Sequence, residues 1–412
     1  MARVRWCGVL GGAMLMVAGC SSARTARESG LQTVVPPTMQ ASPSASVDSA
    51  LPPASGLAHI QTAEGLLTVD LDTGKTTFLD GLVNPDWTRI ASVNKGVAKL
   101  VDTTSREEMR TANVPDGLTV SAISANGTLI AYSPAPEFGP RGLPKARATT
   151  RVAIVSSWSA GAQVLDLAGN LVPEAFSTDG RDLFVLDYVP AAAPDHYEVR
   201  MIDLVTGTKY DVGGRPKEIP DAEQMQGNLR TSVYSPDRNM LFTLYAEYGD
   251  EGHAFIHALN LTEKWSYCID LPDSGRFGDG QATLTASKDN KLYVVGDSGQ
   301  IAQIDAQPYG LTVERSVQLP AATATKNRPT AAVEGIRLIV GHDDRVFFVD
   351  RTTLRLDKTM TMSSAVIGLT GDGNGRVAIA TQSAIDVLDS SSDARRTGLD
   401  TKLPVIVRFG LE

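Results

Sequence analysis

Short runs of Val, Ile, Leu, Phe and Tyr alternate with turn residues from Gly56 to the end of the chain. Alternating apolar and polar positions over such short runs favour β-strands, and no helical period persists for a convincing length. The pattern therefore predicts that residues 56–412 form an all-β domain.

One recurring piece of this pattern is an apolar strand that ends in an acidic or small polar residue and runs into a turn. Asp and Asn bond their own backbone in such turns, and a following glycine supplies a positive φ. Eight copies recur at about 45 residues, and the strands end at Asp70, Asp102, Ser156 (the weakest copy), Asp203, Asn260, Asp305, Asp350 and Asp389.

A second piece alternates with the first and consists of two strands joined by a tight turn of Asp or Asn with Gly or Asn. Such dipeptides between alternating strands are a strong hairpin signal. Clear copies occupy residues 123–130, 176–184, 234–241 and 286–293, and degenerate copies occupy 333–338 and 371–377.

Together the two pieces give a four-stranded antiparallel unit, which is what one blade of a β-propeller requires. The Ser-Pro-Asp-Arg turn at residues 235–238 and its relatives resemble the hairpins of TolB-like, YncE-like (YVTN-type) and WD40-like propeller repeats. The resemblance implies a propeller architecture over residues 56–412. Eight blades are expected, with seven as the alternative because Asp70 and Asp102 are only 32 residues apart. The segment Leu403–Phe409 is expected to close the ring against the first blade near His59 and Ile60.

The N-terminus has the pattern of a secretory signal. Two arginines precede an apolar stretch of twelve residues, Trp6–Val17, which is too short to span a bilayer as a helix. Val17-Ala18-Gly19-Cys20 resembles the bacterial lipobox, which implies cleavage between Gly19 and Cys20 and a diacylglycerol and acyl lipid on Cys20. Residues 1–19 are then the signal peptide, and an ordinary secretory signal that happens to contain a cysteine is the alternative.

Residues 20–55 are rich in Ser, Ala, Thr and Pro and lack any apolar period, as expected of a disordered tether. A flexible chain of this length reaches about 30 Å. The sequence therefore predicts a propeller held on the extracytoplasmic side of the cell membrane.

Composition narrows the possible partners. The formal charge of −9 becomes −11 when Arg3 and Arg5 leave with the signal, which argues against recognition of nucleic-acid phosphates. With Cys7 in the signal and Cys20 lipidated, Cys268 has no intramolecular disulfide partner. The 42% hydrophobic content is expected to stabilise the fold without disulfides.

The four strands of a propeller blade are named a to d from the inner to the outer edge. In this order the a–b and c–d turns lie on one face of the propeller, and the b–c and d–a connections lie on the other. The long segments 134–150, 189–197 and 247–253 are b–c connections, and 213–228, 272–281 and 321–330 are d–a connections. Loops that decorate one face of a rigid scaffold usually carry binding. The candidate binding residues on this face are Phe138, Arg141, Lys145, Arg147, Tyr197, Tyr248, Asp250, Glu251, Phe277 and Asp279.

Local catalytic and metal motifs are weak. His253 and His257 would be about 13 Å apart on a strand, and Gly371–Gly375 lacks the ligand series of a calcium loop. We therefore predict no catalytic residues, no metal and no cofactor besides the lipid. The predicted function is a non-catalytic scaffold that binds a protein, peptide or glycan, and the alternative is a metal-dependent, lactonase-like hydrolase or lyase with its site at the mouth of the central channel.

Overall fold

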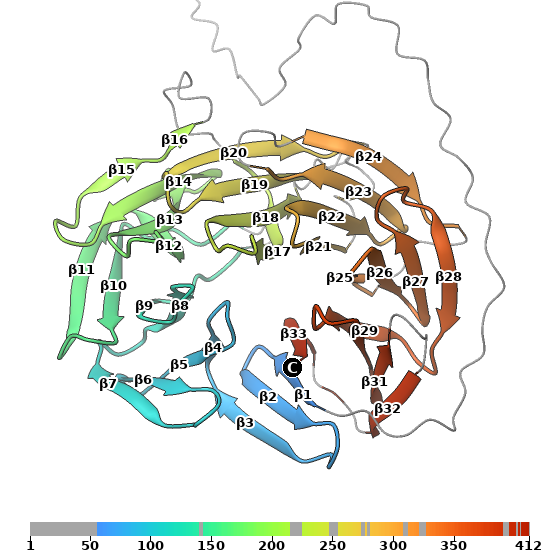
Figure 1. Ribbon diagram of the computed structural model, residues 1–412. Coiled ribbons are helices and arrows are strands. Elements are labelled where there is room, and N and C mark those ends of the chain that lie inside the picture. The colour runs from blue at the N-terminus through green and yellow to red at the C-terminus, as the bar shows by residue number, and fades with distance from the viewer. Residues whose placement is uncertain are drawn as a thin grey trace, which may run out of the picture. The chain divides into compact units, whose positions relative to one another are not determined.

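The computed structural model (Figure 1) describes residues 56–139, 143–214, 225–246, 254–272, 277, 281–307, 312–320, 327–389, 395–400, 403 and 405–411. The proposed signal peptide, Cys20 and the tether lie outside these residues and stay predictions. No helix within the described residues has the length and apolar character needed to cross a membrane.

The domain is an eight-bladed β-propeller, as the sequence predicted. Eight separate sheets form a ring, and the four main strands of each run antiparallel from the centre outward (Figure 1). Asp70 ends a strand of the first sheet and Asp102 ends a strand of the second, so the two do not share one blade. This separation excludes the seven-bladed alternative.

Blades 1 to 4 each contain four strands, named from the inner to the outer edge. Blade 1 consists of β33 (Arg408–Leu411), β1 (Leu57–Gln61), β2 (Gly65–Asp70) and β3 (Thr76–Asp80). Blade 2 consists of β4 (Leu82–Val83), β5 (Arg89–Asn94), β6 (Val97–Asp102) and β7 (Glu108–Asn113). Blade 3 consists of β8 (Thr119–Ile123), β9 (Leu129–Ser133), β10 (Thr149–Ser156) and β11 (Ala162–Ala168). Blade 4 consists of β12 (Asn170–Phe176), β13 (Asp182–Val189), β14 (His196–Asp203) and β15 (Lys209–Asp211).

Blades 5 to 8 repeat the arrangement, with one short extra strand on blade 5. Blade 5 consists of β17 (Asn228–Tyr234), β18 (Met240–Ala246), β19 (Ala254–Asn260), β20 (Trp265–Asp270) and, parallel to β20 at the outer edge, β16 (Gly213–Gly214). Blade 6 consists of β21 (Ala282–Ala286), β22 (Lys291–Gly296), β23 (Gln300–Asp305) and β24 (Thr312–Gln318). Blade 7 consists of β25 (Thr330–Glu334), β26 (Arg337–His342), β27 (Arg345–Asp350) and β28 (Leu356–Thr361). Blade 8 consists of β29 (Val366–Gly371), β30 (Arg376–Thr381), β31 (Ala384–Asp389) and β32 (Arg395–Asp400).

The C-terminal strand closes the ring in blade 1. β33 pairs antiparallel with β1, with Phe409 opposite Ile60 and Gly410 opposite His59. This confirms the predicted closure, although the strand begins at Arg408 rather than at Leu403. The first blade is therefore assembled from both ends of the domain, which ties residues far apart in sequence into one sheet.

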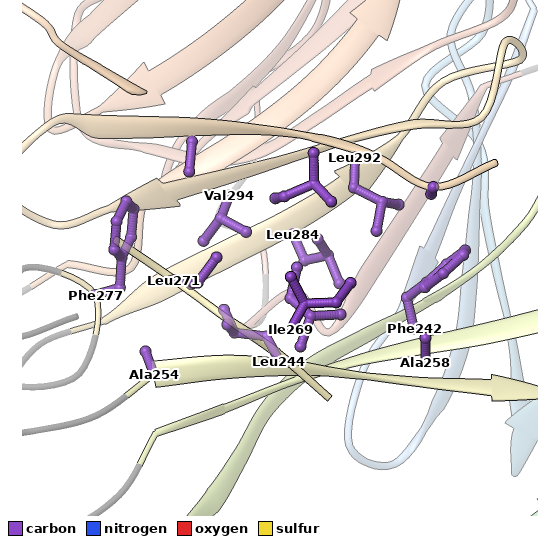
Figure 2. Packing of buried hydrophobic residues seen from close by; sticks show 14 of the residues in the cluster. Phe242, Leu244, Ala254, Ala258, Ile269, Leu271, Phe277, Leu284, Leu292 and Val294 are labelled. Carbon is purple, nitrogen blue, oxygen red and sulfur yellow. The ribbon is translucent and has the colours of Figure 1, made fainter. Parts of the chain in front are cut away.

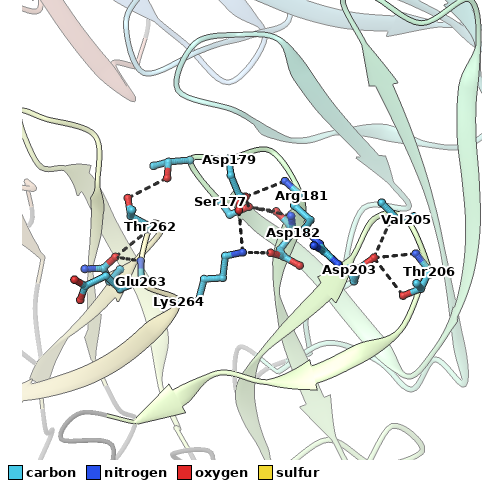
Figure 3. A network of polar contacts seen from close by, with 12 residues as sticks. Ser177, Asp179, Arg181, Asp182, Asp203, Val205, Thr206, Thr262, Glu263 and Lys264 are labelled. Carbon is cyan, nitrogen blue, oxygen red and sulfur yellow. Dashed lines mark hydrogen bonds and ion pairs between the residues drawn. The ribbon is translucent and has the colours of Figure 1, made fainter.

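The repeated polar residues build the c–d and a–b turns. Asp203 Oδ1 accepts the N–H groups of Val205 and Thr206, both at 2.9 Å, and the Thr206 N–H is the main cause that lowers the pKa of Asp203. In the neighbouring a–b turn, Ser177 Oγ donates to Asp179 Oδ1 at 2.6 Å (Figure 3). These local bonds satisfy backbone groups of the turn within a few residues.

The turns also connect neighbouring blades. Lys264, in the c–d turn of blade 5, places its Nζ 3.0 Å from Asp179 Oδ2 and 2.5 Å from Asp182 Oδ2 of blade 4 (Figure 3). Asp182 is almost fully buried, so the pair compensates a charge that burial would otherwise make costly.

The cores lie between adjacent blades. Between blades 5 and 6, Phe242 and Leu244 pack with Leu292 and Val294, and Phe277 joins them from the connection that follows β20 (Figure 2). Burial of each such side chain contributes about 1.5 to 3 kcal/mol. Apolar residues on both faces of the b and c strands thus make a continuous series of interfaces around the ring.

Candidate functional site

The long-looped face carries part of the predicted binding set. Phe138 lies in the connection between β9 and β10, and 55% of its surface is exposed. Lys145 lies in the same connection and pairs with Glu137 at 2.7 Å in a solvent-exposed contact, which raises the pKa of Lys145. Arg147 donates to the carbonyl oxygens of Pro134 and Ala135 at 3.4 and 3.2 Å, so its guanidinium holds the loop together.

Two predicted aromatic residues lie in the core instead of on this face. Tyr197 is fully buried between blades 4 and 5, with its ring centroid 5.4 Å from those of Tyr188 and Tyr245. Phe277 is only 1% exposed and packs between blades 5 and 6. Their positions in the long connections 189–197 and 272–281 predicted that both side chains lie on the surface. Instead, each side chain points inward and fills a space between two blades. The remaining candidates, Arg141, Tyr248, Asp250, Glu251 and Asp279, lie outside the described residues.

A cavity of about 1100 Å³ occupies the central channel. It is lined by the inner strands β17, β21, β25, β29 and β33 and by the turn Pro85-Asp86-Trp87 of blade 2. The charged residues in its described lining are Arg238, Arg328, Arg408 and Asp86, which give a net charge of +2. The described lining of this cavity is therefore positive in a protein whose overall formal charge is −9.

The blade 2 turn extends to the opposite side of the channel. Asp86 Oδ1 accepts from Arg238 Nε at 2.7 Å, and Arg238 belongs to the a–b turn of blade 5. Blades 3 and 4 separate blades 2 and 5 in the ring, so this ion pair connects two turns across the centre. The turn is held in place by Asn84, which is fully buried and donates from Nδ2 to the Ala125 carbonyl at 2.7 Å.

Trp87 and Arg408 stack in the channel wall. The guanidinium carbon of Arg408 lies 3.9 Å from the centroid of the Trp87 ring, a close cation–π geometry. Arg408 donates to the carbonyl oxygens of Asn84, at 3.0 Å, and of Pro85. Burial, with a smaller contribution from Arg238, lowers the pKa of Arg408 to about 10, so it remains protonated at neutral pH.

Close approach of β33 allows the contact. A Cβ built on Gly410 would lie 3.1 Å from Trp87 Cε2, which is tighter than ordinary packing. Trp87 itself has a φ of 62°, a conformation that a bulky residue rarely adopts. Two hydrogen bonds hold the turn in this conformation. Thr103 Oγ1 donates to the Trp87 carbonyl, and Asn84 Oδ1 accepts the N–H of Arg89.

A second polar cluster lies between blades 4 and 5. Glu174, on the inner strand β12, accepts from Thr243 Oγ1 at 3.4 Å. Burial raises the pKa of Glu174 to about 7, although polar contacts with Thr243 and Tyr245 offset part of the shift. Burial raises the pKa of the nearby Tyr234 to about 12, and the charge of Glu174 adds to that shift.

The two weak metal motifs belong to the core and to a hairpin turn. His257 is buried on β19, and burial lowers its pKa to about 4, whereas His253 lies outside the described residues. Gly373 and Gly375 donate their N–H groups to the Glu334 carboxylate at 2.9 and 2.8 Å, so this hairpin binds an anion rather than a cation. Within the described ranges, no group of three or more His, Cys, Asp or Glu side chains is placed to hold a metal ion.

The sequence interpretation missed Trp87, Arg238 and Arg408 as channel residues. The sequence contains one feature that could have identified the turn of Trp87. Asn84-Pro85-Asp86-Trp87 has the same Pro-Asp pair as the turn Ser235-Pro236-Asp237-Arg238, and it occupies the equivalent a–b position in blade 2. That Arg408 would lie over this turn follows only from ring closure, which no local pattern encodes.

No protein-family model matches the chain, and no curated protein matches its sequence. The fold is similar to that of Sqt1 from Saccharomyces cerevisiae, with a TM-score of 0.52, 10% identity and coverage of 85% of this chain and 90% of that one. It is also similar to the dihydro-heme d1 dehydrogenase NirN in complex with DHE, with a TM-score of 0.51, 12% identity and coverage of 89% of this chain and 77% of that one. At such identities these likenesses show a shared fold alone.

Proposed function

We propose that the protein is a lipid-anchored, extracytoplasmic β-propeller that acts as a non-catalytic binding or interaction scaffold at the cell envelope. The observation that carries the proposal is the asymmetry of the two faces. In the blade topology the a–b and c–d turns are short, whereas the long connections, including that between β9 and β10, fall on the opposite face. A rigid ring that concentrates long loops on one face is suited to hold a partner there.

The loop that holds Phe138 shows how this face would make contact. Phe138 is exposed, and its backbone bridges to Pro144, while the Lys145–Glu137 pair lies beside it. Arg147 fastens the base of the loop through main-chain carbonyls. An aromatic group on a tethered loop loses little conformational freedom on binding, which suits a protein, peptide or glycan partner.

The anchor part of the proposal rests on the sequence around Cys20. Two or more acyl chains on one residue give stable membrane attachment, and the residues up to 55 would let the propeller stand clear of the lipid surface. The test is metabolic labelling with palmitate in a bacterial host. We expect label and membrane fractionation in the wild type and neither in Cys20→Ser, while equal fractionation of both proteins would refute the anchor.

The scaffold part is tested by photo-crosslinking from matched positions on the two faces. A photoreactive residue replaces Phe138 on the long-looped face or Ile336, which is 71% exposed, in the a–b turn of blade 7. We expect one reproducible adduct in intact cells from position 138 and none from position 336. Identical adducts from both positions, or none from either, would contradict the choice of face.

The metal-dependent hydrolase remains the competing function and is tested with the same protein. Thermal unfolding is measured with EDTA and then with added calcium, magnesium or zinc, because a bound metal stabilises the folded state. An unfolding temperature that falls by several degrees in EDTA and is restored by one metal, together with hydrolysis of lactones, would replace the scaffold proposal.

A further inference from the structure

We propose that the central channel binds a small organic acid, with its carboxylate at Arg408 and its apolar body against Trp87 and the apolar residues of β29 and of the segment 406–409. The cavity lining includes Gln281 and residues 327–330 from connections of the long-looped face, and the proposal does not depend on the anchor or on a protein partner. It rests on the charge, the donors and the lining of the channel cavity.

The first argument is charge. Arg408 lies in the channel wall and makes no ion pair with any carboxylate among the described residues, since its two hydrogen bonds go to neutral carbonyl oxygens. The one carboxylate in the described lining, Asp86, pairs with Arg238. The nearby charge of Asp86 offsets only part of the cost of burying the Arg408 guanidinium, and an anion placed beside it relieves the rest.

The second argument is hydrogen bonding. A guanidinium carries five N–H donors, and Arg408 uses two of them on the carbonyl oxygens of Asn84 and Pro85. The side chain retains part of its surface toward the cavity. Stacking on Trp87 fixes the plane of the guanidinium, and a fixed planar fork matches a carboxylate in its own plane.

The third argument is the rest of the lining. Ile367, Leu369, Ile406 and Phe409 give an apolar wall next to Arg408. Threonine hydroxyls from three inner strands, Thr231, Thr283 and Thr370, add a few polar groups. The volume of about 1100 Å³ holds a ligand of drug size with some water. An apolar wall with a few polar groups and one arginine fork favours a carboxylic acid with a hydrocarbon body over inorganic phosphate.

The test is calorimetric titration of the mature chain from residue 20, carrying Cys20→Ser so that no lipid is attached. The probes are octanoate and phenylacetate, their neutral counterparts 1-octanol and phenylacetamide, and inorganic phosphate. We expect saturable binding of at least one acid, at least about tenfold weaker binding of its neutral counterpart, and no binding of phosphate. Absence of saturable binding of both acids, or equal binding of acid and neutral counterpart, would overturn the proposal.

Variants assign the binding to this site. Arg408→Gln should weaken the acid at least about tenfold, and Asp86→Asn, which removes the competing carboxylate, should strengthen it about fivefold. Arg351→Gln is the matched control, because Arg351 also lies over an aromatic ring, that of Tyr293, but outside the channel lining. Unchanged affinity in Asp86→Asn would overturn the assignment even if Arg408→Gln fails to fold, as would equal losses in the Arg408 and Arg351 variants.

Discussion

Replacement of Glu174 by glutamine should make the protein more stable at alkaline pH and change it little in acid. Glu174 lies at a bulge in β12, where the pairing with β13 shifts between Pro173 and Ala175. Its Oε2 is buried and has no hydrogen-bond partner in the part of the chain that the structure describes. Burial raises the pKa of this carboxyl from 4.5 to about 7 in the folded state.

The sign and size of the effect follow from linkage. Because the folded pKa is the higher one, the carboxyl's contribution to stability is complete below pH 4.5 and is lost as the pH rises through 7. A shift of this size corresponds to about 3 kcal/mol at full ionisation. Glutamine keeps the shape of the side chain and cannot ionise, so the variant avoids the loss. Between pH 5 and pH 8 the wild type should lose about 2 to 3 kcal/mol more than Glu174→Gln.

Urea unfolding of both proteins at the two pH values measures this difference. His257 acts in the opposite direction, because burial lowers its pKa to about 4 and its contribution is lost as the pH falls from 6.5. That contribution is the same in both proteins and cancels in the comparison. Glu64→Gln, at an exposed position, is the matched control and should follow the wild type. Parallel pH dependence of Glu174→Gln and wild type would refute the burial argument.

Two further substitutions test the packing. Phe277→Ala should lower the free energy of unfolding by about 3 to 5 kcal/mol, because the ring fills a buried interblade space, and unfolding in urea unaffected by the change would contradict the core assignment. Gly410→Val should displace Trp87 and lower the unfolding temperature, since even a Cβ at position 410 would come within 3.1 Å of the indole; unchanged tryptophan fluorescence and stability would show that β33 does not approach the turn so closely.

The blade architecture was predictable because its signals are local. Asp203 accepts hydrogen bonds from the N–H groups two and three residues ahead, and Asp179 accepts one from the N–H of Arg181. About four consecutive residues therefore determine each turn. Every c strand that the repeat predicted, from the one ending at Asp70 to the one ending at Asp389, is present. Closure by the C-terminal strand was predictable for a different reason, since the last strand had no neighbour in sequence to pair with and the first blade lacked its innermost strand.

The candidate site was predicted poorly because it depends on packing across the ring. The sequence pattern around Tyr197 and Phe277 is that of a loop or its flank, yet each residue fills an interblade gap whose size is set by residues of another blade. Arg408 and Trp87 are more than 300 residues apart and meet only after the ring closes. No periodicity links such pairs.

Blade 2, whose inner strand is unusually short, contributes Asp86 and Trp87 to the channel. β4 has only two residues, whereas the inner strand β12 of blade 4 has seven. Because β4 ends at Val83, the turn that follows meets blade 5 across the channel through Asp86, and it provides Trp87 as a platform for Arg408. The positive φ of Trp87 and the burial of the Arg408 charge both cost stability, and proteins retain such costs mainly where they serve a function. The other blades supply enough stability to offset that cost. We therefore expect selection for ligand binding to act on the turn that follows β4 in blade 2.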